Sequence, residues 1–270
     1  MLSMPDKVKN TARLIMVGDV VGEAGIEAVR QHLASLIAAY QADFTVVNGE
    51  NAAGGFGLTE TTLQSLLNAG ADVVSTGNHI WEKRDFWPIL DANPAVLRPG
   101  NYPGSLPGKG LAVFEKAGLR WCIMNLQGRE YMTAIDCPFR ALDAYVATLE
   151  TQKPYLGVVD FHAESSQEKE ALGLYADGRV AVIAGTHTHV QTADQRILPK
   201  GTAYITDLGM TGVDESIIGM DTGICLERNK TQIPVKMELA KGQASIHGIV
   251  VEIDTETGLA RSIERFSLPR

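Results

Sequence analysis

Two histidines, His187 and His189, follow a short apolar run that ends at Gly185. The whole stretch, Val182 to His189, reads V-I-A-G-T-H-T-H, and its brief, β-branched run is typical of a buried strand. On an extended segment residues i and i+2 point to the same side, so we expect the two imidazoles to lie together just beyond the strand. Neutral imidazole is the most common metal-binding side chain, and the pair indicates a metal site if other segments supply partners.

Four other apolar runs also end in residues that can bind a metal. They supply two carboxylates, two amides and two further imidazoles: Asp19, Glu50, Asn51, Asn78, His79 and His162. In open α/β sheets, ligands bind outside the carboxyl ends of the strands. We therefore expect these side chains to meet His187 and His189 in one crevice.

This set of side chains determines the chemistry that we expect. It offers oxygen and nitrogen donors and no thiolate, which suits manganese, iron, nickel or zinc better than a structural zinc site built on cysteine. Seven or eight such residues are too many for one tetrahedral ion, and they suit two ions about 3.5–4 Å apart. Two adjacent ions suit hydrolysis of a phosphate ester, because one activates water and both stabilise the charge on the phosphoryl oxygens.

Hydrophobic spacing predicts the elements that position these residues. Strands and helices alternate from Arg13 to Ser75, which implies a parallel sheet covered by helices. We expect strands over 13–17, 44–47, 72–75, 155–159, 180–184 and 203–206, an antiparallel pair over 111–114 and 121–125, and a closing hairpin over 245–253 and 260–266. Helices are expected over 26–40, after an N-cap at Thr59, from Pro138, and after a capping box formed by Ser165 and Glu168. Prolines and glycines between 93 and 110 indicate an ordered series of turns.

Composition sets the remaining bounds. The 270 residues are 45% hydrophobic and carry a formal net charge of −8, which allows a sizeable core and argues against a long nucleic acid as partner. Cys122, Cys137 and Cys225 have no metal or redox spacing and are expected to be reduced. No apolar segment has the length of a signal peptide or a membrane span, so we expect a cytoplasmic protein that binds no membrane. Residues 1–12 are predicted to form a flexible leader, and residues 13–270 a single domain.

Five motifs in the same order resemble a known family. G18-D19, N48-G49-E50-N51, G77-N78-H79, the isolated His162 and G185-T186-H187-T188-H189 are similar to the motif series of the calcineurin-like metallophosphoesterases. V-N-G-E-N-A-A-G-G-F-G and G-N-H-I-W resemble signatures of one bacterial branch, the YmdB-like 2′,3′-cyclic-nucleotide phosphodiesterases. The resemblance runs from about Arg13 to Phe266. It implies an α/β fold, a sandwich of two mainly mixed β-sheets flanked by helices.

The resemblance also implies a role for each residue of the site. Glu50 would bridge two divalent or trivalent ions, iron or manganese before zinc. Asp19, Asn51 and His189 would complete one site, and Asn78, His162 and His187 the other, so the H-x-H pair would span a dinuclear centre. His79 would bind no metal, and it would protonate or hydrogen-bond the leaving oxygen. The chain departs from the broader superfamily at the first motif, where D-x-H is replaced by Asp19-Val20-Val21, and at Glu50, where an aspartate is usual.

The predicted function is therefore that of a dinuclear-metal phosphodiesterase. A metal-bound hydroxide would open a 2′,3′-cyclic nucleotide or hydrolyse a related small phosphodiester. The alternative is a regulatory protein that senses a nucleotide at the same metal site with little turnover. A dinucleotide-binding loop at Gly18, Gly22 and Gly25 is disfavoured because the spacing misses G-x-G-x-x-G.

Other residues have weaker indications. Phe56 in the glycine-rich loop could stack on a base, and Arg129 could meet a phosphate, although core packing and a surface ion pair explain them as well. Asp160 could orient His162. His32 and His247 are expected to be structural or solvated. The proline-rich middle and the closing hairpin could each serve an interface in a homo-oligomer.

Overall fold

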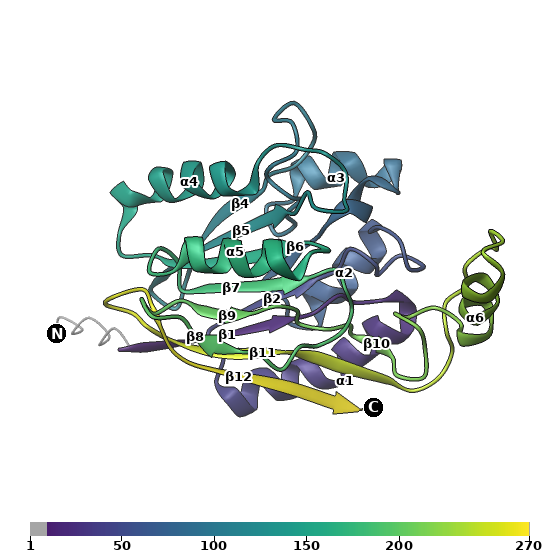
Figure 1. The fold of residues 1–270 in the computed structure, drawn as a ribbon. Coiled ribbons are helices and arrows are strands. Elements are labelled where there is room, and N and C mark those ends of the chain that lie inside the picture. The colour runs from purple at the N-terminus through teal and green to yellow at the C-terminus, as the bar shows by residue number, and fades with distance from the viewer. Residues whose placement is uncertain (1–9, 270) are drawn as a thin grey trace.

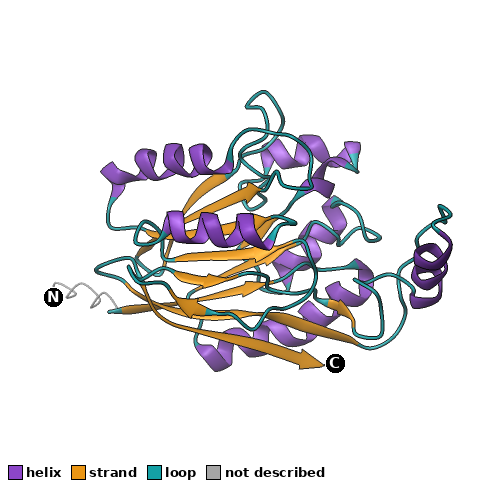
Figure 2. Ribbon diagram, viewed as in Figure 1, coloured by secondary structure: helices purple, strands orange, loops and turns teal. Residues whose placement is uncertain are grey.

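Two mixed β-sheets pack face to face in the computed structural model, which describes residues 10–269 (Figure 1). Helices lie on the outer faces of both sheets (Figure 2). This arrangement is the predicted sandwich. The first nine residues of the predicted leader lie outside the described part, and the first strand begins at Thr11. The division into a leader and a single domain stays a prediction.

The first sheet contains the strands that open and close the chain. Its order is β10-β11-β1-β2-β3, with β12 paired to β11. The strands β1, β2 and β3 are mutually parallel, and β11 of the closing hairpin runs antiparallel to both β1 and β12. Their bounds are β1 Thr11–Val17, β2 Phe44–Asn48, β3 Val73–Ser75, β10 Gly212–Val213, β11 Ala244–Asp254 and β12 Ala260–Pro269.

The second sheet is built from the middle of the chain. Its order is β4-β5-β6-β7-β9-β8, and β5, β6, β7 and β9 are parallel. The bounds are β4 Leu111–Lys116, β5 Leu119–Gln127, β6 Leu156–His162, β7 Val182–Thr186, β8 Arg196–Ile197 and β9 Ala203–Ile205. Since β6 extends to His162, this histidine closes the strand and does not follow it.

Six α-helices and three short 3-10 helices connect the described strands. The α-helices are α1 Gly22–Tyr40, α2 Glu60–Asn68, α3 Trp87–Ala92, α4 Pro138–Leu149, α5 Ser166–Ala176 and α6 Thr222–Thr231. The 3-10 helices are η1 Asn78–Trp81, η2 Arg84–Phe86 and η3 Glu150–Gln152. In the part of the chain from 10 to 269, no helix combines the length and apolar character needed to cross a bilayer.

The apolar core lies in three layers. The central layer is shared by the two sheets and includes Trp121, which stacks on Phe44 at a centroid distance of 4.9 Å. The second layer lies between the first sheet and α1 and α2, and the third between the second sheet and α4 and α5. Because both faces of each sheet are covered, the parallel strands are continuous apolar runs. Polar side chains enter the interior mainly where these runs stop.

Of the two predicted helix N-caps, one is confirmed in full and the other only in part. Thr59 caps α2, and its side chain accepts a hydrogen bond from the Thr62 backbone at 3.2 Å. Ser165 likewise accepts from the Glu168 backbone at 3.2 Å, but the reciprocal half of the predicted capping box is wrong. The Glu168 carboxylate instead accepts hydrogen bonds from the backbone N–H groups of Arg129 and Glu130.

The helix α6 has no counterpart among the predicted elements. It projects away from the sandwich at the right of Figure 1, and of its residues only Cys225 is buried. A helix that is polar on nearly all sides carries no apolar stripe at helical spacing, which is why hydrophobic spacing missed it. Its N-terminus is fixed by Asp221, whose carboxylate accepts a hydrogen bond from the Ile224 backbone at 2.9 Å.

Candidate metal centre

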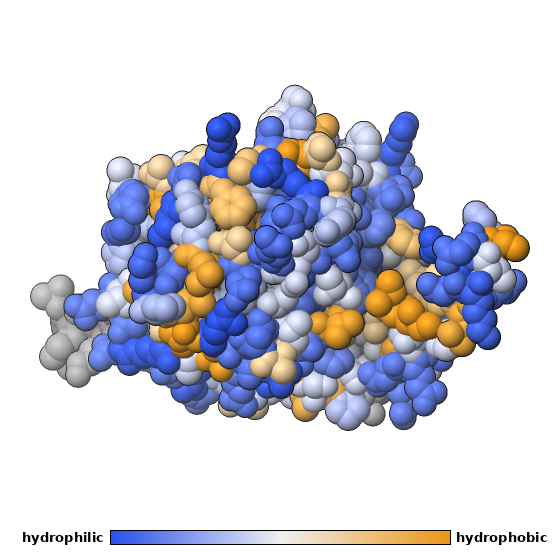
Figure 3. Space-filling view, in the orientation of Figure 1, coloured by the Kyte–Doolittle hydropathy of each residue, from blue (hydrophilic) through white to orange (hydrophobic). Residues whose placement is uncertain are grey.

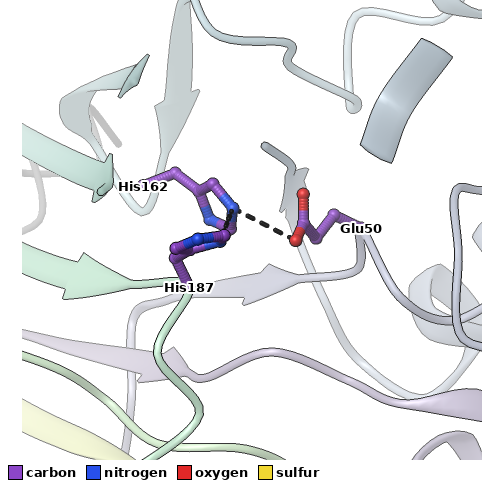
Figure 4. Close-up of side chains that lie close together, drawn as sticks. All are labelled: Glu50, His162 and His187. Atoms are coloured by element: carbon purple, nitrogen blue, oxygen red, sulfur yellow. Dashed lines mark hydrogen bonds and ion pairs between the residues drawn. The ribbon is translucent and has the colours of Figure 1, made fainter. Parts of the chain in front are cut away.

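Four of the predicted ligands meet at one atom, Nε2 of His162. Glu50 Oε1 lies 3.1 Å from it, Asn78 Oδ1 3.1 Å and His187 Nδ1 3.0 Å. One donor atom each of Glu50, His162 and His187 lie within 4.8 Å of one another, and Figure 4 shows these side chains converging from separate segments. Glu50 and Asn78 follow strands of the first sheet, whereas His162 ends β6 and His187 follows β7 in the second sheet. The cluster therefore joins the two sheets at their carboxyl edge.

A second group lies beside this cluster. Asp19 Oδ2 accepts a hydrogen bond from the His187 backbone at 3.1 Å, and Asp19 Oδ1 lies 3.8 Å from His162 Nδ1. Among the described residues, Asp19 Oδ1 and Asn51 Oδ1 are buried and have no hydrogen-bond partner. His189 donates through Nδ1 to the Ile218 carbonyl at 3.0 Å, which leaves the lone pair of Nε2 available.

The donor atoms of these two groups are of the kinds that bind metal ions. A buried oxygen without a donor costs free energy, and a metal ion is the partner that a carboxylate and an amide oxygen can share. Asn78, His162 and His187 could hold one ion, and Asp19, Asn51 and His189 the other, with Glu50 between them. The donors are oxygen and imidazole nitrogen throughout, which suits iron, manganese or zinc. The structure thus brings the seven predicted metal residues to one edge of the sandwich.

The backbone of the H-x-H stretch differs from the prediction. The strand β7 ends at Thr186, and both histidines have positive φ, 99° at His187 and 66° at His189. The expectation of an extended segment with both rings on the same side is wrong. Positive φ is unfavourable for a residue with a side chain and persists only where tertiary contacts enforce it. It allows His187 to reach His162 while His189 turns toward Ile218.

A buried ion pair holds this strained turn, and sequence spacing gave no sign of it. Lys169 of α5 is 1% exposed, and its Nζ lies 2.7 Å from Asp207 Oδ2. The same carboxylate oxygen accepts hydrogen bonds from the backbone N–H and the hydroxyl of Thr188, at 3.1 and 2.7 Å. Thr188 stands between the two histidines, so Asp207 fixes the turn and Lys169 balances its charge. A lysine in a helix with a weak apolar stripe normally indicates a solvated face.

Asp160 forms a second buried network behind the cluster. Its Oδ1 accepts from the Thr186 hydroxyl at 2.7 Å, and Thr186 Oγ1 lies 2.9 Å from His162 Nδ1. Its Oδ2 accepts from Asn48 Nδ2 of the first sheet at 2.9 Å and from the Ser75 hydroxyl. Asp160 thus orients His162 through Thr186 and links both sheets.

Burial and mutual charge set the protonation of the cluster. Burial opposes a charged imidazole at His162, but Glu50 and Asp19 outweigh it and raise the pKa of His162 to about 9. Burial also acts against a charged Glu50, yet His162 lowers the pKa of Glu50 to about 2. Burial and the neighbouring His162 lower the pKa of His187 to about 3. A cation that binds His162 would therefore compete with a proton.

The pKa of Asp19 is shifted in the opposite direction from that of Glu50. Burial raises the pKa of Asp19 to about 6, although His189 and His162 partly offset it. A cation beside Asp19 would favour the charged carboxylate, because a neighbouring positive charge lowers the pKa of an acidic group.

The backbone of His79 contacts the cluster, whereas its side chain points away from the ligands. Its N–H donates to Glu50 Oε2 at 3.2 Å, while its Nδ1 lies 3.6 Å from Glu82 Oε1. Phe56 packs edge-on against the His79 ring at a centroid distance of 4.9 Å. Phe56 and His79 are therefore neighbours on the first sheet's side of the centre.

Arg129 lies elsewhere. Its guanidinium NH2 contacts Cys137 Sγ at 3.4 Å, and the residue lines a cavity of about 490 Å³ with Arg140 and Asp136. In the part of the chain that the structure covers, no hydrogen bond or ion pair joins the Arg129 side chain to a metal-centre residue. Its predicted role at a phosphate stays a prediction.

The outer surface is mixed in character. Figure 3 shows polar side chains over most of the visible face, with apolar side chains scattered among them and a group of them beside the projecting helix α6. Ile218, whose carbonyl holds His189, is 53% exposed and lines a cavity of about 460 Å³ together with Cys225 and Arg228 of α6. The segment that carries α6 therefore lies against the metal centre on the side of His189.

Comparison with known proteins is consistent with this geometry. The family model described as YmdB-like protein matches residues 15–266. The 2′,3′-cyclic-nucleotide 2′-phosphodiesterase of Bacillus subtilis (strain 168) is 46% identical over 253 residues, which are 94% of this chain and 96% of that protein. The crystal structure of a novel phosphatase from Mycoplasma pneumoniae superposes with a TM-score of 0.90 at 34% identity, covering 96% of this chain and 94% of that one. The crystal structure of a hypothetical protein from Thermus thermophilus superposes with a TM-score of 0.88 at 38% identity, covering 96% and 99%.

Proposed function

The chain belongs to the YmdB-like family, and from this premise we propose that it is a metal-dependent phosphodiesterase. Its substrates would be 2′,3′-cyclic nucleotides or related small phosphodiesters. The observation that carries the proposal is the meeting of Glu50, Asn78 and His187 around His162 Nε2, next to the unpartnered oxygens of Asp19 and Asn51 in the described chain. The relative from Bacillus subtilis, which carries that activity in its name, supports the substrate class.

Two divalent or trivalent ions would occupy the centre, iron or manganese before zinc, with Glu50 as the residue that both share. When bound, such ions lower the pKa of a water ligand and neutralise charge on phosphoryl oxygens. Glu50 is the carboxylate closest to His162, with Oε1 3.1 Å from His162 Nε2, and its Oε2 is held by the backbone N–H of His79. The cations would also make this edge attractive to a small anionic ester, although the chain is acidic as a whole.

His79 would hold the proton for the leaving oxygen. Its backbone is fixed on Glu50, its ring is partly exposed, and Phe56 packs on the edge of that ring. The ring would therefore act on a substrate bound at the centre without serving as a metal ligand, in the role of a general acid. Phe56 would be the residue beside the nucleoside. A cytoplasmic location and a homo-oligomeric state stay predictions.

The test is hydrolysis by purified protein loaded with Mn²⁺ or Fe²⁺, with 2′,3′-cyclic AMP and bis-p-nitrophenyl phosphate as substrates. We expect turnover of both. The His79→Ala variant should keep its metal content and lose about 10²–10⁴-fold in kcat, while His32→Ala, on α1, should match the wild type. Loss of metal from His79→Ala would make His79 a ligand. Tight binding of the nucleotide with no hydrolysis under any metal would favour the nucleotide-sensing alternative.

A further inference from the structure

The buried side chain of Gln127 lies on the strand next to that of His162, and only one of its two polar atoms has a hydrogen-bond partner among the described residues. Gln127 is the last residue of β5 and is 0% exposed. Its Oε1 accepts a hydrogen bond from the Tyr102 hydroxyl at 3.1 Å. Its Nε2 has no hydrogen-bond partner among the residues from 10 to 269. A buried amide donor without a partner is costly, and it is available to a ligand that comes within hydrogen-bond distance.

The strand register places the Gln127 side chain on the same face of the sheet as His162. In the parallel pair of β5 and β6, Gln127 is aligned with His162, and aligned residues of neighbouring strands point to the same face. The preceding residue on that face is Asn125, whose Oδ1 accepts from the Thr76 backbone at 3.1 Å. Gln127 is the next residue after Asn125 on this face. Because Asn125 contacts Thr76, we expect Gln127 to lie near Asn78 and His79, which follow Thr76 in the chain.

The proline- and glycine-rich loop over 93–110 holds both the backbone and the side chain of Gln127. Asn101 Oδ1 accepts from the Gln127 backbone at 2.9 Å, and Asn101 Nδ2 donates to the Gln127 carbonyl at 2.7 Å. The Tyr102 hydroxyl donates to the amide oxygen of Gln127. The Tyr102 ring packs edge-on against Trp81 of η1 at a centroid distance of 5.3 Å. With its oxygen held, the amide can present only its NH2 group. The clamp therefore orients the donor before any ligand binds.

We propose that Gln127 Nε2 donates a hydrogen bond to a non-bridging phosphoryl oxygen of the phosphodiester bound at the metal centre. This inference rests on the proposed function. Charge grows on such an oxygen when phosphorus is attacked, so a preoriented donor in a buried site stabilises the transition state more than the ground state. Gln127 would thus be a catalytic residue, and Tyr102 and Asn101 would be the residues that position it.

Three variants test the assignment. Gln127→Met removes the donor at nearly constant volume, and removal of one such donor should lower kcat by about 10²-fold. Gln127→Glu keeps an oxygen for Tyr102 but presents a carboxylate to the phosphate, and it should lose at least as much. Tyr102→Phe leaves the amide in place without its clamp, and we expect a loss of only several-fold. Metal content, measured by mass spectrometry, should equal that of the wild type in all three.

The choice of substrate separates a phosphoryl contact from a nucleoside contact. Bis-p-nitrophenyl phosphate has neither ribose nor base, so a donor to the phosphoryl oxygen predicts equal losses on this ester and on 2′,3′-cyclic AMP. A loss confined to the cyclic nucleotide would overturn the assignment, as would a loss of metal or an unchanged kcat in Gln127→Met.

Inorganic phosphate provides a readout that does not depend on turnover. Calorimetric titration of the Mn²⁺-loaded proteins should give weaker phosphate binding for Gln127→Met than for the wild type, by about 10-fold. This difference should remain even if neither ester is hydrolysed, in which case the proposed function fails and the donor assignment stands. Equal phosphate affinities in the two proteins would overturn the donor assignment whatever the activity.

Discussion

The two ends of the first sheet use aspartate and glutamate in opposite ways. At the amino-terminal end of the parallel strands, Asp43 accepts a hydrogen bond from the Arg13 backbone at 3.0 Å, and Asp72 accepts from the Thr45 backbone at 2.9 Å. At the carboxyl end, Asp19 is fully buried with Oδ1 unpartnered among the described residues, and Glu50 is 1% exposed against His162.

The difference shows which acidic residues maintain the fold and which await a ligand. A carboxylate that accepts hydrogen bonds from backbone N–H groups stabilises the local structure at the start of a strand. A carboxylate buried beside imidazoles without enough donors lowers stability until a cation binds. If this contrast is correct, substitutions at the carboxyl end should change metal binding and activity, and substitutions at the amino-terminal end should change stability alone.

The largest effect should come from Gly77→Ala. A Cβ at Gly77 would collide with the His162 ring and with Glu50 Oε2, so both residues would have to move. The φ of Gly77 is −150°, outside the left-handed region, so backbone strain adds little. We expect at least a roughly 100-fold loss of kcat/KM and a clear fall in metal content measured by mass spectrometry.

Gly104→Ala is the matched control, because a Cβ there meets nothing within 4 Å. It should keep both metal content and activity. Wild-type behaviour of Gly77→Ala would mean that the centre tolerates large movements of its ligands, and the contrast between the two ends would fail there.

The next effect should come from Lys169→Met, which leaves Asp207 buried without its cation. We expect the free energy of unfolding to fall by about 3 kcal/mol and metal affinity to fall by about 10-fold, because Asp207 also holds Thr188. Denaturant titration and competition with a chelator measure the two quantities separately.

Lys116→Met is the matched control at the opposite end. Lys116 Nζ lies 2.6 Å from Asp72 Oδ2, and the Lys116 side chain is 46% exposed. Its removal should cost less than about 1 kcal/mol and leave the chelator competition unchanged. Should Lys169→Met lose stability and keep metal affinity, the buried pair would support the fold and have no part in positioning the histidines.

Sequence patterns were sufficient to predict the features of the fold and of the candidate site that depend on neighbouring residues in the chain. Short β-branched runs predicted the parallel strands, and the residues at their ends predicted the metal centre, because ligands gather at the carboxyl edge of a parallel sheet. Glu50, His162 and His187 meet as expected although long stretches of chain separate them.

The remaining features depend on tertiary context. His187 and His189 have positive φ, and Thr188 between them donates hydrogen bonds to Asp207, which lies in another loop. Lys169 is buried, and its charge is balanced by the carboxylate of Asp207. Gln127 is an ordinary strand residue in the sequence, and its importance arises from the strand register with His162 and the clamp of Tyr102. Such pairings between distant segments leave no local spacing to detect.

The smallest effect should come from Asp254→Asn, at the amino-terminal end of the sheet, where Asp254 is aligned with Thr11. Asp254 Oδ1 accepts from the backbone N–H groups of Glu256 and Thr257, at 2.9 and 2.8 Å, and Oδ2 binds the Arg261 guanidinium. These donors lower the pKa of Asp254 well below its usual range. A lowered pKa stabilises the fold above the unfolded-state pKa of about 4, and this contribution is lost as the pH falls below that value.

We therefore expect Asp254→Asn to lower the Tm at pH 7 by about 2 °C, and the difference from the wild type to shrink steadily from pH 4 to pH 2. Glu256→Gln removes the same charge from the same turn, but its backbone N–H still donates to Asp254, so the Tm should stay close to that of the wild type. Metal content and kcat should be unchanged in both variants. A change in either quantity in Asp254→Asn would show that the two ends of the sheet are coupled, since this turn reaches Asp19 through the strand β1 and its neighbours.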